Sequence, residues 1–329
     1  MGEKCEFMNV VDMHCDTISG LWRQRREGKH PSLRSNQMHM DLERMQKGDY
    51  LLQNFAMFVM LEREPDPLVN VLELIDEYYR QIEENRDLIA PVHTYADIQR
   101  NVEAGRMSAM LTIEEGGVLK GSVEVLRNLY RLGVRMLTLT WNFENELGWP
   151  NTVARLPVYD PAKRYGLKPA GIEVVREMNR LGMIIDVSHL GDDGFWDVVT
   201  NSDRPFVASH SNARAVCGHS RNLTDEMIRA LADKGGVMGI NFCGDFLNPD
   251  GSSRTADMVR HIKHIRNVGG IGCIGLGTDF DGIDGELEIR DAAHMPLLIG
   301  ELERAGFTGA EIDAVTHGNV LRLYQEILR

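Results

Sequence analysis

The sequence has few cysteines, no long hydrophobic run and no basic tract. No stretch of about 18 apolar residues is present, and the first residues lack the apolar core of a signal peptide, so neither a membrane span nor export is expected. The five cysteines are an odd number without a C-x-x-C pair. This argues against a disulfide framework and a thiolate zinc site. We therefore expect a cytoplasmic protein.

Positive charge is also scarce. The 36 Lys and Arg residues against 49 Asp and Glu residues give a formal net charge of -13. Attraction to nucleic acid or to an anionic membrane is therefore not expected. The chain has 329 residues, of which 43% are hydrophobic. This suits one α/β barrel with insertions, so we expect a single domain over residues 1–329.

Short β-like segments alternate with amphipathic, helix-like segments along almost the whole chain. Most β-like segments are continuously apolar, as is typical of parallel strands buried on both faces. They span residues 10–16, 51–59, 108–115, 134–141, 183–189, 205–210, 237–242 and 271–279. The helix-like segments include 67–85, 122–132, 170–181, 224–234, 256–267 and 295–305. Eight alternating units predict an α/β protein with a (β/α)8 TIM barrel.

A doubly wound sheet is the structural alternative. It would need fewer strands and usually a phosphate-binding glycine loop after the first strand. The residues there are His14-Cys15-Asp16-Thr17, which form no such loop. Two inserted loops interrupt the minimal barrel, at 18–48 after the first strand and at 142–169 after the fourth. Because loops at the carboxyl ends of barrel strands build active sites, both are candidate lids or substrate walls.

Side chains that commonly bind metals follow five of the eight strand-like segments. In His14-Cys15-Asp16 the imidazole and the carboxylate are two residues apart, so on a strand both point to one face while Cys15 points away. Together they form half of a divalent metal site. His189 and His210 each end another segment and can share a metal. Each residue alone is more often an ordinary polar side chain, but the set favours a shared metal site.

Two carboxylates complete the expected site. Glu115 precedes Gly116-Gly117, which leaves room for a ligand close to the backbone. We expect Glu115 to bridge two cations and Glu114, on the opposite face, to be solvated. Asp279 and Asp281 have equal parity after the last strand. Asp279 is nearer the strand end and is the candidate general base, whereas Asp281 is expected to hold the following loop.

The order of these motifs resembles the membrane (renal) dipeptidase family of zinc peptidases, within the amidohydrolase-like barrels. The resemblance runs from about Val10 to Gly318-Asn319. It rests on H-x-D, E-G-G, a histidine after Asp-Val-Ser, Ser-His-Ser, Ser-Arg-Asn and Asp-Phe-Asp-Gly. It implies a binuclear zinc dipeptidase in which a hydroxide that bridges the metals attacks a dipeptide, including dipeptides with a C-terminal D-residue.

The resemblance also implies a role for each site residue. One Zn²⁺ would be held by His14 and Asp16, the other by His189 and His210, and Glu115 would bridge them together with the water or hydroxide. Asp279 would be the catalytic aspartate, and Arg221 would bind the carboxylate of the substrate. Mn²⁺ or Co²⁺ are alternatives to zinc because nitrogen and oxygen ligands accept them too.

The sequence departs from the mammalian members after the fourth strand. Where they carry a histidine in Leu-Thr-His, this chain has Leu139-Thr140-Trp141-Asn142. Trp141 and Asn142 are therefore candidate substrate-binding residues, with Asn142 offering a replacement hydrogen bond. The mammalian members are secreted and lipid-anchored, whereas this chain resembles a bacterial cytoplasmic relative, and the resemblance suggests a homodimer.

Two other functions remain open from the sequence. The same residues would serve another barrel metallohydrolase, such as an N-acyl-amino-acid deacylase or a lactonase. A barrel that has lost catalysis and only binds metal is the third reading, which the complete set of site residues argues against. Outside the site, His261 and His264 are three residues apart without an acidic partner pattern, and we expect them on a solvated helix face.

Overall fold

The computed structural model describes residues 9–152 and 159–329. All strand pairings between its named strands are parallel, and β1 pairs with both β2 and β9. Eight strands therefore close into a barrel in the order β1-β2-β4-β5-β6-β7-β8-β9. The strands are β1 (Val10–Cys15), β2 (Tyr50–Phe58), β3 (Ile89–Val92), β4 (Met107–Glu114), β5 (Met136–Thr138), β6 (Ile184–Asp186), β7 (Val207–Ala208), β8 (Val237–Ile240) and β9 (Ile274–Leu276). The predicted TIM barrel is confirmed.

The additional strand β3 was not predicted. It pairs with the first half of β4, from Ile89 opposite Met107 to Val92 opposite Met110. The second half of β4 pairs with β5 instead, beginning with Thr112 opposite Met136. The two short strands thus lie along one edge of the longer β4. A four-residue segment that contains Pro91 carries little strand signal by itself, because proline lacks an N–H group for the ladder.

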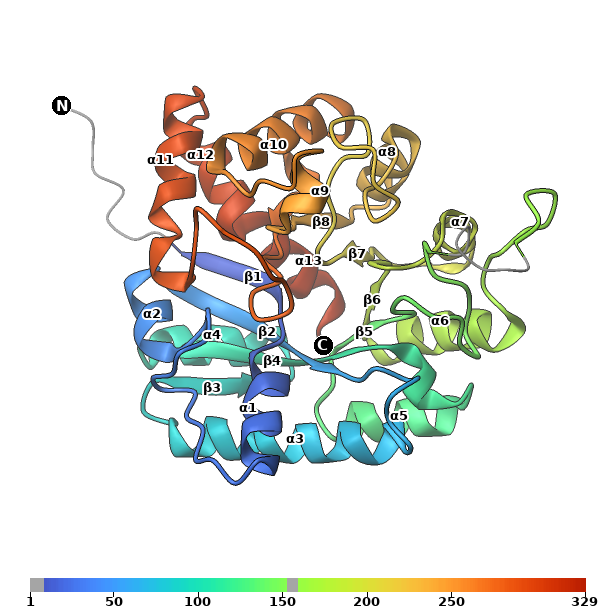
Figure 1. Ribbon diagram of the computed structural model, residues 1–329, viewed down its shortest axis with the longest axis horizontal. Helices are drawn as coiled ribbons and strands as arrows, with labels where there is room; N and C mark the ends of the chain where they lie inside the picture. Colours follow the sequence, from blue (N-terminus) through green and yellow to red (C-terminus); the bar gives the residue numbers. More distant parts are fainter. Residues whose placement is uncertain (1–8, 153–158) are drawn as a thin grey trace.

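Helices surround the barrel, with α3 and α5 on one side and α10 and α11 on the opposite side (Figure 1). Two of the predicted helix starts are capped by side chains: Ser122 Oγ accepts a hydrogen bond from Val125 N, and Thr224 Oγ1 accepts one from Met227 N. The helices are α1 (Thr17–Arg26), α2 (Leu42–Lys47), α3 (Pro67–Glu84), α4 (Tyr95–Glu103), α5 (Val123–Arg131), α6 (Pro169–Leu181), α7 (Asp192–Asn201), α8 (Asp225–Asp233), α9 (Gly244–Leu247), α10 (Thr255–Gly269), α11 (Pro296–Arg304), α12 (Gly309–Asp313) and α13 (Asn319–Ile327).

The inserted loop at 18–48 contains most of α1 and all of α2. Asp281 ties this part of the chain to the segment after β9. Its Oδ2 accepts a hydrogen bond from Thr17 Oγ1 at 2.6 Å, and its Oδ1 accepts one from His39 N at 2.6 Å. The second inserted loop, at 142–169, includes residues 153–158, which lie outside the described residues. Its described part contacts the segment after β6 through a bridge between Pro150 and Leu190.

The apolar core has two layers. One fills the inside of the barrel near its amino end, where α13 closes it. This layer contains Val11, Met13, Leu52, Met110, Met136, Ile184, Val207 and Val237, with Val320, Leu323, Tyr324 and Ile327 of α13. The other layer, which includes Cys15, Leu111 and Ile113, packs between the barrel and its helices. The plug at the amino end leaves the carboxyl end of the barrel for a site.

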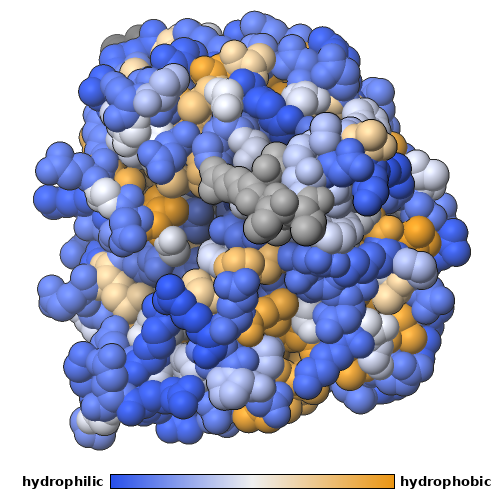
Figure 2. Space-filling view, turned by 45° about the vertical axis from the view of Figure 1, so that its right-hand side comes forward, coloured by the Kyte–Doolittle hydropathy of each residue, from blue (hydrophilic) through white to orange (hydrophobic). Residues whose placement is uncertain are grey.

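The protein surface is mainly polar on the face that Figure 2 shows, where hydrophobic residues form only small, scattered groups. Among the described residues, no helix is long and apolar enough to cross a membrane.

Candidate metal centre

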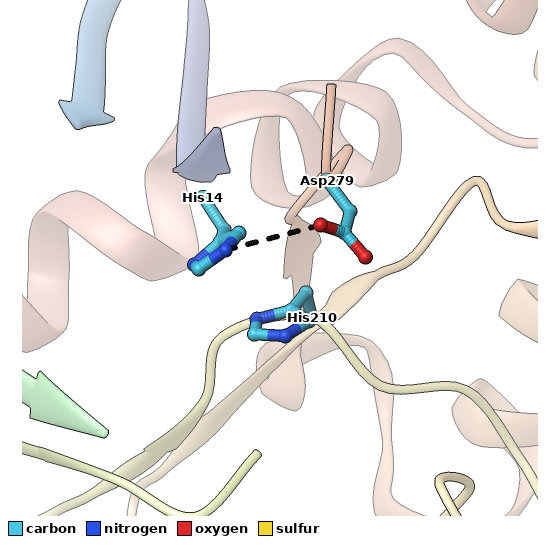
Figure 3. A group of neighbouring side chains, drawn as sticks. All are labelled: His14, His210 and Asp279. Carbon is cyan, nitrogen blue, oxygen red and sulfur yellow. Dashed lines mark ion pairs between the residues drawn. The ribbon is translucent and has the colours of Figure 1, made fainter. Parts of the chain in front are cut away.

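Imidazole and carboxylate groups from several strands converge at the carboxyl end of the barrel. His14 lies near the end of β1, His210 follows β7 and Asp279 follows β9. Their three side chains point toward one another (Figure 3). The rings of His14 and His210 have centroids 3.8 Å apart, and His14 Nε2 is 3.9 Å from Asp279 Oδ1. Segments far apart in the sequence therefore meet at one point.

Glu114 lies between the histidines. Its Oε2 is 3.5 Å from His14 Nε2, and its Oε1 is 3.0 Å from His189 Nε2 and 3.5 Å from His210 Nε2. Asp16 Oδ2 completes the group, 3.5 Å from His14 Nε2. Three overlapping sets of side chains have ligand atoms close enough to share an ion: His14, His210 and Asp279; Glu114, His189 and His210; and His14, Asp16 and Glu114.

The structure brings together most of the residues that the sequence singled out. His14, Asp16, His189, His210 and Asp279 all belong to this cluster, and each is buried. Asp281 instead holds the first inserted loop, through Thr17 and His39, and not the loop that follows it, which the sequence had suggested.

Glu115 does not face the histidines, so the expected orientation of the two glutamates is wrong. Its Oε1 accepts hydrogen bonds from Gly117 N at 2.7 Å and Asn145 Nδ2 at 2.5 Å, and its Oε2 accepts one from Trp141 N at 3.0 Å. The reason is strand parity. Glu114 is an even number of residues from Met110, which lies inside the barrel, whereas Glu115 is the first residue beyond β4.

A bulge in β1 sets the direction of His14 and Asp16. Asp12 pairs with Gln53 and Cys15 pairs with Phe55, so three steps along β1 match two along β2. Met13 consequently packs inside the barrel, while Cys15 packs outward beneath the helices. His14 and Asp16 therefore lie on the same side of the chain, and Cys15 points away from them, as the sequence predicted.

The backbone at this end of the barrel is strained. Four non-glycine residues that follow strands have positive φ angles: Glu115 at 110°, His189 at 66°, Asp279 at 63° and Asp281 at 67°. L-residues rarely adopt such angles, and they cluster at functional sites where the surrounding contacts enforce them. For Asp279, one such contact is the hydrogen bond that its N–H donates to His14 O at 3.2 Å.

The electrostatics of the cluster favour a bound cation. Burial opposes charge on His14, but the carboxylates of Glu114 and Asp16 outweigh it and raise the pKa of His14 well above its ordinary value. Burial lowers the pKa of His189 to about 4. Burial and the charge of His14 lower the pKa of His210 well below its ordinary value. Neutral imidazoles offer a nitrogen lone pair to a metal. Burial also raises the pKa of Asp279 to about 7, with Asp16 and Glu114 adding to the effect.

Several buried polar atoms in the cluster have no hydrogen-bond partner among the described residues. They are both ring nitrogens of His14 and Oδ1 of Asp16. Such orphaned atoms are rare in folded proteins and need an explanation, for which an ion is one candidate. The donor set of imidazole nitrogens and carboxylate oxygens fits Zn²⁺ and related divalent metals.

Neighbouring side chains orient the histidines. Asn142 Oδ1 lies 2.9 Å from His189 Nδ1, so the amide oxygen accepts a hydrogen bond from the ring. Ser209 Oγ lies 2.7 Å from His210 Nδ1 and donates to Asp186 Oδ2 at 2.6 Å. Asp186 therefore supports His210 through Ser209 and does not contact the ring directly. Such outer contacts fix the tautomer and direction of a metal-binding histidine.

A cavity of about 500 Å³ opens above the cluster. Trp141 and Asn142 line it, and the Trp141 ring lies 4.9 Å from that of Phe58. The walls of the cavity also include Arg23, Cys243, Asp245, Phe246, Ile283 and Asp284. This size is typical of sites for small molecules.

Arg221 is buried beside the cluster and is absent from the lining of this cavity. Its Nη1 donates to Ser211 Oγ at 3.2 Å and its Nη2 donates to His210 O at 3.2 Å. Its Nε is buried without a hydrogen-bond partner among the described residues. The Nε–H group therefore remains for a ligand, together with the second N–H of each Nη.

Sequence reasoning missed Glu114 and Asn241. Asn241 directly follows the buried strand β8, and its Nδ2 donates to Asp279 Oδ2 at 2.9 Å. The position of Asn241 after an apolar strand is the same signal that identified the histidines. The parity of Glu114 with Met110 identifies it only once the structure places Met110 inside the barrel.

Residues 3–328 match the membrane dipeptidase family, Peptidase family M19. The chain belongs to this family. The predicted family, and with it the prediction of a hydrolase that acts on peptide bonds, is confirmed.

Curated relatives match most of this chain. The dipeptidase aclJ of Aspergillus oryzae is 33% identical over 300 residues, which cover 88% of this chain and 70% of the relative. An uncharacterised protein from the pqqA 5' region of Klebsiella pneumoniae is 38% identical over 237 residues, covering 70% of this chain and 86% of that protein.

Solved structures share the fold over nearly the whole chain. A metallopeptidase from Rhodobacter sphaeroides, liganded with a phosphinate mimic of the dipeptide L-Ala-D-Ala, has a TM-score of 0.88 and is 26% identical; the match covers 98% of this chain and 100% of that one.

Proposed function

We propose that this protein is a dipeptidase whose centre holds two divalent cations, with Zn²⁺ as the first candidate. The observation that carries this proposal is the position of Glu114. It belongs to one candidate ligand set with His14 and Asp16 and to another with His189 and His210. A carboxylate shared by two ligand sets is the arrangement that a bridging ligand requires. Glu114 thus takes the role that the sequence had suggested for Glu115.

The cations would be held by nitrogen and oxygen ligands from separate strands. His14 and Asp16 would bind one, His189 and His210 the other, and Glu114 both. When bound, such cations lower the pKa of a coordinated water and polarise a carbonyl oxygen. Without cations, the buried carboxylates of this centre would have too little positive charge beside them. Unpaired negative charge is costly inside a protein.

Asp279 is proposed as the group that moves the proton. Asn241 Nδ2 donates to its Oδ2, so this oxygen is fixed while Oδ1 is directed toward His14. A carboxylate held at this point can accept a proton from the attacking water and then donate it to the leaving amine of the peptide. Burial favours the protonated carboxyl that the second step needs.

The substrate would lie in the cavity above the cluster. We propose that the remaining N–H groups of Arg221, Nε–H among them, contact the C-terminal carboxylate, because a guanidinium recognises carboxylates through several donors. Trp141 and Asn142 would form the wall beside His189. Recognition of the chain end at a short distance from the cluster limits the substrate to dipeptides. The ligand of the Rhodobacter sphaeroides relative, a mimic of L-Ala-D-Ala, supports including dipeptides with a C-terminal D-residue.

One experiment tests the proposal. The protein is freed of metal with a chelator, and Zn²⁺, Mn²⁺ or Co²⁺ is added back. Activity is then measured on L-Ala-L-Ala, L-Ala-D-Ala, an N-acetylated amino acid and a lactone. We expect metal-dependent hydrolysis of the dipeptides and little of the others. Preference for the N-acetylated amino acid or the lactone would instead identify a deacylase or a lactonase. Failure to bind any of the metals would refute the proposed centre.

A further inference from the structure

Glu115 connects the end of β4 to the loop after β5 through two of the three hydrogen bonds that its carboxylate accepts. Its carboxylate accepts from Gly117 N on its own side and from Trp141 N and Asn145 Nδ2 across the gap. The side chain is fully buried, and the residue has a φ angle of 110°. A non-glycine residue in this conformation costs about 1–3 kcal/mol, so the surrounding contacts must compensate for the strain.

Asn145 extends the connection within the loop. Its Nδ2 also donates to Leu139 O at 2.9 Å, and its Oδ1 accepts from Leu147 N at 2.7 Å and Gly148 N at 3.1 Å. Asn145 thus folds the loop back onto the end of β5, with Glu115 as its partner on β4. All the polar atoms involved have partners, which makes the connection rigid.

The loop held in this way carries Trp141 and Asn142, which reach the cluster of histidines and carboxylates. The Trp141 ring lies 4.9 Å from Phe58 and 6.0 Å from His189, measured between ring centroids. Asn142 Oδ1 accepts from His189 Nδ1 at 2.9 Å, and the opposite ring nitrogen of His189 faces Glu114 Oε1 at 3.0 Å. The direction of His189 Nε2 therefore depends on Asn142, which directly follows Trp141, the residue whose amide Glu115 holds.

We propose that Glu115 is a positioning residue that fixes the Trp141-Asn142 segment and thereby orients His189 toward the cluster. Two consecutive glutamates then act on the same centre in different ways. Glu114 enters the cluster from β4, while Glu115 acts through the facing loop and touches neither a ligand atom nor the cavity. The metal-binding part of this inference rests on the proposed function; the hold on the loop does not.

The variant Glu115→Gln tests the inference. It keeps the size of the side chain but places an NH₂ group where all three neighbours are donors, so at least one hydrogen bond is lost. We expect faster amide hydrogen exchange at Trp141. We also expect roughly 10- to 100-fold weaker binding of one of two divalent ions when metal-free protein is titrated with Co²⁺, the range typical of outer contacts to metal ligands.

Glu144→Gln is the matched control. Glu144 is on the same loop, but its carboxylate is partly exposed and pairs with Lys168 Nζ. This variant is expected to leave both the exchange at Trp141 and the Co²⁺ titration unchanged. Unchanged exchange in a folded Glu115→Gln protein would overturn the inference, and so would faster exchange with unchanged Co²⁺ affinity.

Asn142→Ala provides the second variant in case Glu115→Gln does not fold. It removes only the contact between Asn142 and His189, so Co²⁺ binding should weaken while the Trp141 amide stays protected from exchange. Unchanged Co²⁺ binding would overturn the transmission to His189. If the wild-type protein binds no Co²⁺, the proposed metal-dependent function is refuted. The inference that Glu115 orients His189 for metal binding is then refuted as well. The exchange measurement still decides separately whether Glu115 holds the loop.

Discussion

At the scale of single residues, Asp279 combines a strained backbone with a fixed carboxylate. Its φ angle is 63°, and Asn241 holds Oδ2. Asparagine tolerates such a φ angle better than most residues, and the amide oxygen of the substituted side chain could still accept from Asn241, so Asp279→Asn should fold. We expect kcat to fall by about 10²- to 10⁴-fold, the usual contribution of a general acid–base group, with bound metal unchanged.

Steady-state kinetics together with metal analysis check this prediction. Asp281→Asn is the matched control, because Asp281 also has a positive φ angle and lines the cavity, but its carboxylate contacts Thr17 and His39 and lies outside the cluster. It should lose stability and keep most of its kcat. Equal losses of kcat in the two variants would contradict the assignment of Asp279.

Arg221 allows a separate prediction about substrate binding. Its Nε is free for a carboxylate while its other nitrogens hold Ser211 and the backbone of His210. A hydrogen bond to a charged group contributes about 1.5–3 kcal/mol, so Arg221→Ala should raise KM for dipeptides roughly 10- to 100-fold. Comparing each dipeptide with its C-terminal amide isolates the carboxylate: the wild type should discriminate between them and the variant should not. A variant that still discriminates would rule out Arg221 as the anchor.

The two glutamates show how far the sequence predicts a site residue. The histidines and Asp279 could be located because they follow apolar segments directly. Glu114 and Glu115 are adjacent, and the glycines after Glu115 favoured the wrong one. The parity of Glu114 with Met110 decides between the two glutamates only when the structure shows that Met110 lies inside the barrel. By contrast, the bulge that directs His14 depends on pairing between β1 and β2, which no single segment encodes.

At the scale of elements, α10 contains a buried histidine that was expected to be solvated. His261 is fully buried; its Nδ1 accepts from Ala213 N at 3.1 Å and its Nε2 donates to Leu247 O at 3.0 Å. His264, on the same helix, is partly exposed and pairs with Asp225 at 2.7 Å. The expectation was therefore wrong for His261, because the three-residue spacing does not show which of the two positions faces the barrel.

His261 predicts a pH dependence of stability. Burial lowers its pKa to about 4, from an ordinary value of 6.5. Between these values the unfolded chain binds a proton that the folded chain does not, so the contribution of His261 is complete above pH 6.5 and is lost as the pH falls. The slope is about 1.4 kcal/mol per pH unit. Urea unfolding at pH 7 and pH 5 should show that the free energy of unfolding falls less for His261→Gln than for the wild type. Equal falls in the two proteins would contradict this prediction.

The eight barrel strands were predicted, but β3 and the extent of several strands were not. Eight strand-like segments form the barrel, yet β7 has two residues and β5, β6 and β9 have three each. Apolar character continues beyond the hydrogen-bonded ladder because the following residues are still buried. Strand ends are thus set by the neighbouring strand, which local sequence does not contain.

At the scale of the whole molecule, the two ends of the barrel have different tasks. The amino end is closed by α13, where Tyr324 OH accepts from Asn54 Nδ2 at 2.7 Å inside an apolar layer. The carboxyl end carries strained residues and buried carboxylates, which reduce stability unless a ligand compensates. This division between a stabilising end and a functional end is typical of TIM barrels.

The division predicts that metal binding stabilises the entire fold. Asp16, Glu114 and Asp279 come from distant segments, so the unfolded chain has no comparable site for a cation. A cation at 100 times its Kd then adds about 2.7 kcal/mol per site to the free energy of unfolding. We expect a chelator to lower the thermal midpoint and added Zn²⁺ to restore it. Glu114→Gln should lose most of this shift, whereas Glu144→Gln should keep it. A midpoint that does not respond to the chelator in protein shown to contain metal would mean that the cluster is not where the metal binds.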